Sequence, residues 1–373
     1  MSENKNFFCT RSFLRLEARQ NGKVHPCCPG WCNDYSFGNF YEESFANIWN
    51  SKKAVEFRRS ILDGSYRFCN KLCLLLSNKE IMGEFLSESE IINKYTEKMD
   101  YPKMPVLSHD QQCNIRCRIC RDHQIYNSSE NTERLNSRIF EVFLPMVSNA
   151  DSVTLSGSGE ALASKHSRNL IKLMAEKYPK LKFNLYSNGL LLNERNFKEL
   201  GITDRINNII ISLHATTKKT YDKIVLDSDF YEIIKNIEWL SKMKKIGNDG
   251  IFQLVFVVSL INYKEMIPFI KMARTYEACT NFLEYTNFGS KMGEQYKKWA
   301  VFTKEHPHYN KFVKIVNNDI FKGNDCIMPA IFQNLKPIST TEWLKYRLKD
   351  YSEVINRTLQ KIHRPSLIIR GYK

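Results

Sequence analysis

Residues 113–120 read Cys-Asn-Ile-Arg-Cys-Arg-Ile-Cys, so that three and then two residues separate successive cysteines. Three thiolates on one short loop can hold three corners of a [4Fe–4S] cluster. The fourth iron then has no protein ligand, as a catalytic metal site needs an open position for its substrate. With 11 cysteines in 373 residues, about one random chain in a hundred would contain this spacing. The run therefore indicates a cluster-binding loop, and the sequence around it must supply the rest of the argument.

Strand-like and helical patterns alternate around this loop. Compact runs rich in β-branched or aromatic residues predict buried strands at 153–155, 183–186, 209–211 and 254–258. Two amphipathic helices lie between them, with apolar faces that carry Leu170, Leu173 and Met174 in the first and Ile233, Ile237 and Leu240 in the second. The alternation predicts an α/β fold with a parallel sheet, whose chemistry belongs at the carboxyl ends of the strands.

Short polar motifs follow several of these strands, in a fixed order. The strand at 153–155 leads into Ser156-Gly157-Ser158-Gly159-Glu160, and the strand at 183–186 leads into Ser187-Asn188-Gly189. The strand at 209–211 is followed by Ser212. Glycines let the backbone approach a ligand closely, and a carboxylate can pair with an ammonium group. Together with the cysteine run, these motifs resemble the radical S-adenosylmethionine (radical SAM) superfamily.

The resemblance implies a partial (β/α)6 TIM-like barrel, with residues 104–108 at the place of its first strand. It also implies an enzyme that cleaves S-adenosylmethionine (SAM) reductively to give a 5′-deoxyadenosyl radical. It implies a [4Fe–4S] cluster on Cys113, Cys117 and Cys120. Residues at the family's SAM-contacting positions are Ile119 near the adenine, Gly157, Gly159 and Glu160 at the methionine moiety, Ser187 and Asn188 after the third strand, and Ser212 near the ribose. One departure is Val225, because many relatives carry an arginine at this position after Tyr-x-x-Ile. His214 is interpreted as a structural histidine.

The N-terminal cysteines form a second pattern. Cys9 is followed by Gly22 and Cys27, and Cys69 and Cys73 close the segment. Together with Gly38-Asn39 and Ile48-Trp49-Asn50, this order resembles a SPASM module, which here precedes the barrel and predicts one auxiliary [4Fe–4S] cluster. The preferred ligands are Cys9, Cys27, Cys69 and Cys73, with Cys28 and Cys32 as alternatives. A structural zinc site built from the same thiolates is the other interpretation.

These patterns divide the chain into four parts. The SPASM-like module covers residues 1–85, a polar, helix-prone connector 86–103, the radical SAM barrel 104–290, and a C-terminal region of unknown role 291–373.

Relatives with this module oxidise, cross-link or epimerise peptides or carbohydrates, which makes these the predicted substrates and reactions. An epimerase needs a hydrogen donor, and Cys279 and Cys326 are the two cysteines outside both clusters. A small hydrophobic role in the core is the simpler interpretation of each. The resemblance also implies an electron donor such as flavodoxin or ferredoxin.

Composition bounds the remaining possibilities. The net charge of +15 fits either a lysine-rich solvated surface or an anionic partner, and no arginine-rich block indicates nucleic-acid binding. Residues 1–6 lack the apolar core of a signal peptide and no stretch is long and apolar enough to span a membrane, so a cytoplasmic protein is expected. The alternative function is a non-catalytic iron–sulfur or zinc protein that binds a nucleic acid or protein partner.

Overall fold

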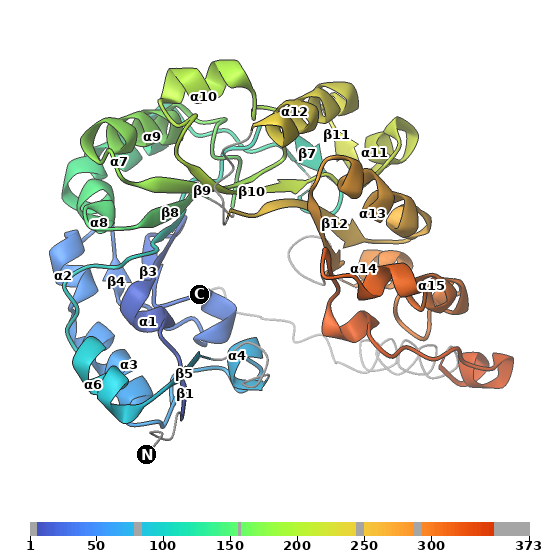
Figure 1. The fold of residues 1–373 in the computed structure, drawn as a ribbon, viewed down its shortest axis with the longest axis horizontal. Coiled ribbons are helices and arrows are strands. Elements are labelled where there is room, and N and C mark those ends of the chain that lie inside the picture. Colours follow the sequence, from blue (N-terminus) through green and yellow to red (C-terminus); the bar gives the residue numbers. More distant parts are fainter. Residues whose placement is uncertain are drawn as a thin grey trace, which may run out of the picture.

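The computed structural model describes residues 6–77, 84–121, 123–155, 158–243, 250–286 and 293–346. Its centre is a ten-stranded sheet with the strand order β14-β13-β12-β10-β9-β8-β6-β2-β3-β4. The sheet curves into an open arc, with helices along its outer side (Figure 1). Cys113, Cys117 and Cys120 follow one of its central strands, so the fold places the cluster loop at the edge of a parallel sheet.

Six parallel strands with helical crossovers form the predicted partial barrel. They are β6 (Val106–Ser108), β8 (Ser152–Leu155), β9 (Lys182–Ser187), β10 (Ile206–Ser212), β12 (Phe252–Val258) and β13 (Cys279–Glu284). The connecting helices are α7 (Ser129–Ser137), α8 (Leu144–Val147), α9 (Lys165–Lys177), α10 (Glu194–Leu200), α11 (Lys218–Ile224), α12 (Phe230–Lys242) and α13 (Met266–Thr275). The five predicted strands and both predicted helices are confirmed, with ends that differ by a few residues.

Local sequence explains where the crossover helices begin. The side chains of Ser164, Thr217 and Asp229 each accept a hydrogen bond from a backbone N–H in the first turn of α9, α11 and α12. Such caps satisfy donors that the helix itself leaves unpaired. Leu170 and Met174 of α9 are buried against the sheet, as their spacing predicts.

The described residues of the N-terminal module form five short strands and several helices. Its elements are β1 (Asn6–Phe8), α1 (Arg11–Leu14), β2 (Glu17–Arg19), β3 (Lys23–His25), β4 (Gly38–Asn39), α2 (Phe45–Trp49), α3 (Lys52–Leu62), α4 (Leu74–Ser77) and β5 (Glu84–Leu86). Strand β2 pairs in parallel with β6, so the module extends the barrel sheet directly. The helix-prone connector forms α6 (Glu88–Lys94), which a capping box between Ser87 and Glu90 begins.

Arg58 ties the module together from its centre. Its side chain is fully buried and donates to the carbonyls of Ser12, Trp49 and Glu97 and to the Asn50 side chain. The guanidinium also lies 4.1 Å from the centre of the Trp49 ring. Burial lowers the pKa of Arg58 to about 9. Because backbone carbonyls satisfy it, the buried cation needs no carboxylate partner.

Strands β7 (Arg116–Cys117) and β11 (Val225–Leu226) form a separate two-stranded antiparallel sheet. After β13 the chain forms α14 (Glu294–Trp299), α15 (Tyr309–Val316) and β14 (Cys326–Ile327). Strand β14 pairs in parallel with β13, so the C-terminal region also contributes to the sheet. Among the described residues, no helix combines the length and the apolar character that a membrane crossing requires.

Candidate functional site

The three loop cysteines lie between β6 and α7, with Cys117 in the short strand β7. Val225 of β11 pairs with Cys117, and the N–H of Arg118 donates to the carbonyl of Ile224 at 2.8 Å. The position where many relatives carry an arginine is therefore a buried valine that braces the cluster loop. This pairing holds the backbone of the cysteine run in place without any bound group.

The start of the loop is anchored to α9 through buried polar side chains. Asp110 accepts hydrogen bonds from the hydroxyls of Ser164 and Ser167. His109 and His166 are both buried, and their Nε2 atoms lie 2.8 Å apart, so one imidazole donates to the other. Burial lowers the pKa of both histidines, that of His166 to about 4.

The turn before Glu160 packs directly on the cluster loop. The N–H of Glu160 donates to the carbonyl of Gln112 at 2.7 Å. A Cβ atom at Gly159 would lie 2.4 Å from that same carbonyl oxygen, which leaves no room for a side chain. Arg121 closes the contact from the other side by donating to the carbonyls of Gln111 and Ser158. The backbone of the turn and that of the loop are thus in contact, and only glycine fits between them.

Glu160 connects the ends of two strands. Its carboxylate is buried and accepts hydrogen bonds from the Ser187 hydroxyl and from the N–H of Asn188 at 2.7 Å. Burial raises the pKa of Glu160, and these hydrogen bonds oppose the rise. The Asn188 side chain donates to Asn114 Oδ1 at 2.9 Å. The N–H of Leu162 donates to the Glu160 carboxylate at 3.4 Å, so three protein donors share its two oxygens.

The remaining predicted contacts lie around this centre or outside the described residues. Ile119 is half-buried against the core, and Ser212 is the last residue of β10, next to β12. His214 is buried, and its Nδ1 accepts from the N–H of Val257 at 3.2 Å, which agrees with a structural role. Gly157 lies outside the described residues.

A basic cleft adjoins the cluster loop. It has a volume of about 610 Å³ and lies between the loop and α14, lined by Arg116, Arg118, Arg121, Leu226, Glu294, Gln295, Lys298 and Trp299. Four of these side chains are cationic and one is anionic. Arg121 is engaged with backbone carbonyls, and Arg116 lies 3.4 Å from Asp227. The cleft therefore presents net positive charge beside the cysteines, which favours an anionic ligand.

The four preferred auxiliary cysteines surround one cavity in the N-terminal module. Cys9 follows β1, Cys27 follows β3, and Cys69 and Cys73 lie between α3 and α4. Their cavity has a volume of about 100 Å³ and is completed by Arg11, Ser12, Trp31, Phe57, Ile61, Tyr66, Leu75 and Leu76. Within the described part of the chain, no group of three or more His, Cys, Asp or Glu side chains is spaced for a single metal ion.

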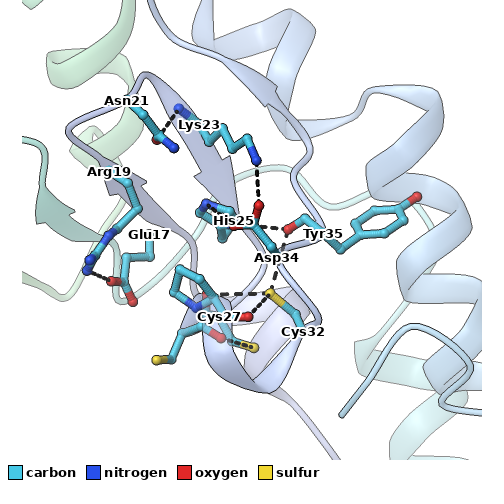
Figure 2. Close-up of polar contacts among 11 residues, drawn as sticks. Glu17, Arg19, Asn21, Lys23, His25, Cys27, Cys32, Asp34 and Tyr35 are labelled. Atoms are coloured by element: carbon cyan, nitrogen blue, oxygen red, sulfur yellow. Dashed lines mark hydrogen bonds and ion pairs between the residues drawn. The ribbon is translucent and has the colours of Figure 1, made fainter. Parts of the chain in front are cut away.

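The two alternative cysteines lie outside the cavity lining, although the Cys32 thiol is 4.0 Å from the carbonyl of Cys27. Cys32 is fully buried, and its thiol lies 3.7 Å from the carbonyl of Pro29 and 3.6 Å from that of Tyr35 (Figure 2). Cys28 is exposed and lies near Glu17. Neither is among the residues that line the cavity.

At both sites, burial raises the pKa of cysteine thiols. Burial raises the pKa of Cys9 to about 11 and that of Cys69 to about 12, and it also raises the pKa of Cys113 and Cys117. A bound metal stabilises the thiolate and displaces the proton. Sulfur ligands in largely apolar surroundings suit an iron–sulfur cluster, so both cysteine sets fit such a group.

The two remaining cysteines differ in the face they present. Phe282 of β13 packs against Phe269 of α13, so that face of the strand points to the helices. Cys279 alternates to the opposite, inner face, at the amino end of the strand. Cys326 pairs with Thr280, which shares the Phe282 face. The structure places neither cysteine beside the cluster loop, which follows the carboxyl end of β6.

Sequence reasoning missed several residues that support the site. Gln20, His109, Asp110, Arg121 and His166 all make contacts with partners distant in sequence. The alternation Leu16-Glu17-Ala18-Arg19 is a signal for a strand in the module, since Leu16 and Ala18 are fully buried. Its pairing with β6 has no such signal.

Two profiles of known families match segments of this chain. The profile of the radical SAM superfamily matches residues 107–273, and that of SPASM, an iron–sulfur cluster-binding domain, matches residues 9–74. A FeMo cofactor biosynthesis protein, NifB of Methanocaldococcus infernus, is 22% identical over 187 residues. That match covers 47% of this chain and 61% of NifB.

Two solved structures found by comparison have low sequence identity and low TM-scores to this chain. TYW1 with a lysine–pyruvate adduct is 15% identical, with a TM-score of 0.35 over 57% of this chain and 70% of that one. Methylornithine synthase (PylB) is 11% identical, with a TM-score of 0.31 over 49% of this chain and 53% of that one.

Proposed function

Because this chain belongs to the radical SAM superfamily and carries a SPASM domain before its barrel, we propose that it cleaves SAM at the Cys113–Cys120 loop and abstracts hydrogen from an anionic peptide or carbohydrate. Family membership makes it an enzyme that uses SAM, a [4Fe–4S] cluster and auxiliary iron–sulfur chemistry. The convergence of Glu160, Asn188 and Cys113 at one edge of the sheet carries the proposal. When bound, these cofactors supply the one-electron cleavage that yields methionine and the 5′-deoxyadenosyl radical.

The chain's own residues would bind the clusters and bind and orient SAM. The thiolates of Cys113, Cys117 and Cys120 would hold the cluster, and the buried Glu160 carboxylate would accept hydrogen bonds from the SAM ammonium. Ser187 and Asn188 fix the orientation of that carboxylate by donating to it. Cys9, Cys27, Cys69 and Cys73 would hold one auxiliary cluster in the cavity of the module.

The substrate class follows from the cleft beside the cluster loop. Arg118 and Lys298 line it without a side-chain partner among the described residues, and Glu294 is its one carboxylate. A substrate that carries carboxylate or phosphate groups would gain from these charges. We propose oxidation, cross-linking or epimerisation as the outcome. For epimerisation, Cys279 is the better placed of the two candidate hydrogen donors, because it lies on the inner face of β13.

The first experiment measures 5′-deoxyadenosine by mass spectrometry, using anaerobically reconstituted protein with SAM and a reductant. The wild type should form it, and the triple variant Cys113→Ala/Cys117→Ala/Cys120→Ala should not. The matched control is Cys69→Ala/Cys73→Ala, which should lose auxiliary iron and keep the iron of the cluster loop. Absence of 5′-deoxyadenosine from wild-type protein with a full, reducible cluster would reject the proposal.

Two variants test the substrate class, and two candidate protein reductants test the electron donor. Arg118→Glu and Lys298→Glu reverse charge in the cleft and leave the cluster ligands intact, so turnover of an anionic substrate should fall without loss of iron. Reduced flavodoxin or ferredoxin should support 5′-deoxyadenosine formation in place of a chemical reductant. If both variants modify the substrate as fast as the wild type, the substrate is not recognised through this cleft.

A further inference from the structure

The N-terminal module contributes a side chain to the turn that precedes Glu160. Strand β2 pairs in parallel with β6, with Glu17 opposite Val106 and Arg19 opposite Ser108. Parallel strands end at the same edge of a sheet, so the residue after β2 reaches the edge that carries the cluster loop. That residue is Gln20, and its Oε1 accepts a hydrogen bond from the Ser158 hydroxyl at 2.9 Å.

Ser158 has one anchor on each side. Its carbonyl accepts from Arg121 of the cluster loop, and its hydroxyl donates to Gln20 of the module. Ser158 is buried, with only 8% of its surface exposed. Next to it, Gly159 lies against the loop backbone and Glu160 begins the contact with Ser187 and Asn188. The hydrogen bond that Gln20 accepts from Ser158 therefore joins the module directly to the turn.

We propose that Gln20 is a positioning residue for SAM, through which the N-terminal module orients the turn that presents Glu160. The module then has two roles in one fold, because it holds its own cluster and also forms part of the wall of the SAM site. This inference rests on the proposed function, in which the Glu160 turn binds SAM. Gln20 itself acts through Ser158 and needs no contact with the cofactor.

The test compares three variants of the full, reconstituted protein. Gln20→Ala removes the acceptor, Gln20→Glu keeps an acceptor oxygen at the same reach, and Asn21→Ala changes an exposed neighbour whose hydrogen bond stays within the hairpin. The measurements are the Kd of SAM, the KM and kcat for 5′-deoxyadenosine formation, and the electron paramagnetic resonance signal of the reduced cluster with SAM added.

We expect Gln20→Ala to raise the Kd and KM for SAM about two- to tenfold, the effect of one hydrogen bond. The kcat should change less than these two constants, and the signal seen on SAM addition should differ from that of the wild type. Gln20→Glu should restore the wild-type values, and Asn21→Ala should match the wild type. A merely structural role would lower stability without this split or this rescue.

Each contrary result has a definite meaning. Wild-type affinity and signal in Gln20→Ala would overturn the inference, while 5′-deoxyadenosine from the wild type would leave the proposed function standing. A wild type that neither binds SAM nor forms 5′-deoxyadenosine would overturn both. If Gln20→Ala does not fold, Ser158→Ala deletes the same hydrogen bond from the other partner, and unchanged SAM affinity there would overturn the inference.

Discussion

Replacing Gly159 with alanine should disable the cluster loop while the rest of the fold persists. The added Cβ would lie 2.4 Å from the carbonyl oxygen of Gln112 and 2.8 Å from that of Asp110. Both contacts are with backbone, so no flexible side chain can move aside. Gln112 immediately precedes Cys113, which means that the displaced segment carries the first cluster ligand.

The size of the effect follows from the overlap. A contact of 2.4 Å falls about 1 Å short of ordinary van der Waals separation. Overpacking of this kind costs about 1–3 kcal/mol, and loss of the hydrogen bond from the Glu160 N–H to Gln112 adds about 1 kcal/mol. A misplacement of about 1 Å can lower a rate about 100-fold. We therefore expect a loss of about 2–4 kcal/mol in stability and about 100-fold in 5′-deoxyadenosine formation.

The assay separates the two cysteine sites. Iron content and the spectrum of the reduced protein are measured for Gly159→Ala beside the wild type, together with the rate of 5′-deoxyadenosine formation. Gly30→Ala is the matched control, because no atom lies within 4 Å of a Cβ there. Iron in the auxiliary site should survive in both variants. Wild-type rate and wild-type iron in Gly159→Ala would refute the steric argument.

Three further predictions concern buried ionisable groups. Arg58→Met should cost about 3 kcal/mol or more of unfolding free energy in urea titrations, because the buried carbonyls of Ser12 and Trp49 and the partly buried carbonyl of Glu97 lose this donor. Burial lowers the pKa of His166 from 6.5 to about 4, so the unfolded chain binds more protons between these values. As the pH falls from 7.5 to 5, protonation of His166 in the unfolded chain should lower the free energy of unfolding of the wild type by about 2 kcal/mol. His166→Gln should show a flatter dependence of stability on pH. Burial raises the pKa of Glu160 above 4.5, so its ionisation opposes folding as pH rises. Glu160→Gln should gain stability relative to the wild type between pH 4 and pH 7 in thermal melts, although it should bind SAM more weakly.

Each of these has a result that contradicts it. An Arg58→Met protein as stable as the wild type would mean that the carbonyls find other donors. Equal pH profiles for His166→Gln and the wild type would show that His166 ionises normally in the folded state. A stability difference between Glu160→Gln and the wild type that does not change with pH would show the same for Glu160.

Local signals in the sequence were sufficient to predict the cluster loop, the Gly159-Glu160 turn and the buried strands beside them. The cysteine spacing at 113–120 and the Gly159-Glu160 turn lie within short segments, and each stays together whatever the rest of the chain does. The apolar runs at 153–155 and 254–258 predicted buried strands because short runs rich in β-branched and aromatic residues are typical of strands in a protein core. The order of the SPASM and radical SAM regions, with the module first, is likewise confirmed.

Cysteine spacing alone left the auxiliary ligands open, and the fold shows which of these cysteines line a common cavity. Cys27, Cys28 and Cys32 lie within six residues of one another, so spacing treats them alike. In the structure only Cys27 of the three faces the cavity that Cys9, Cys69 and Cys73 share. That cavity forms because segments more than 40 residues apart meet, and no periodicity in the sequence describes such a meeting.

The sequence by itself determined the two cysteine patterns, the barrel strands and the chemistry that they imply, because these depend on spacing and on periodicity over a few residues. The tertiary structure decided that the module is part of the barrel sheet, through the pairing of β2 with β6 and the hydrogen bond from Ser158 to Gln20. It also decided that Val225 braces Cys117 and that His109 meets His166. The packing of the whole chain determines which residues meet in such contacts. The local sequence of one partner in a strand pair or a buried hydrogen bond does not identify the other partner.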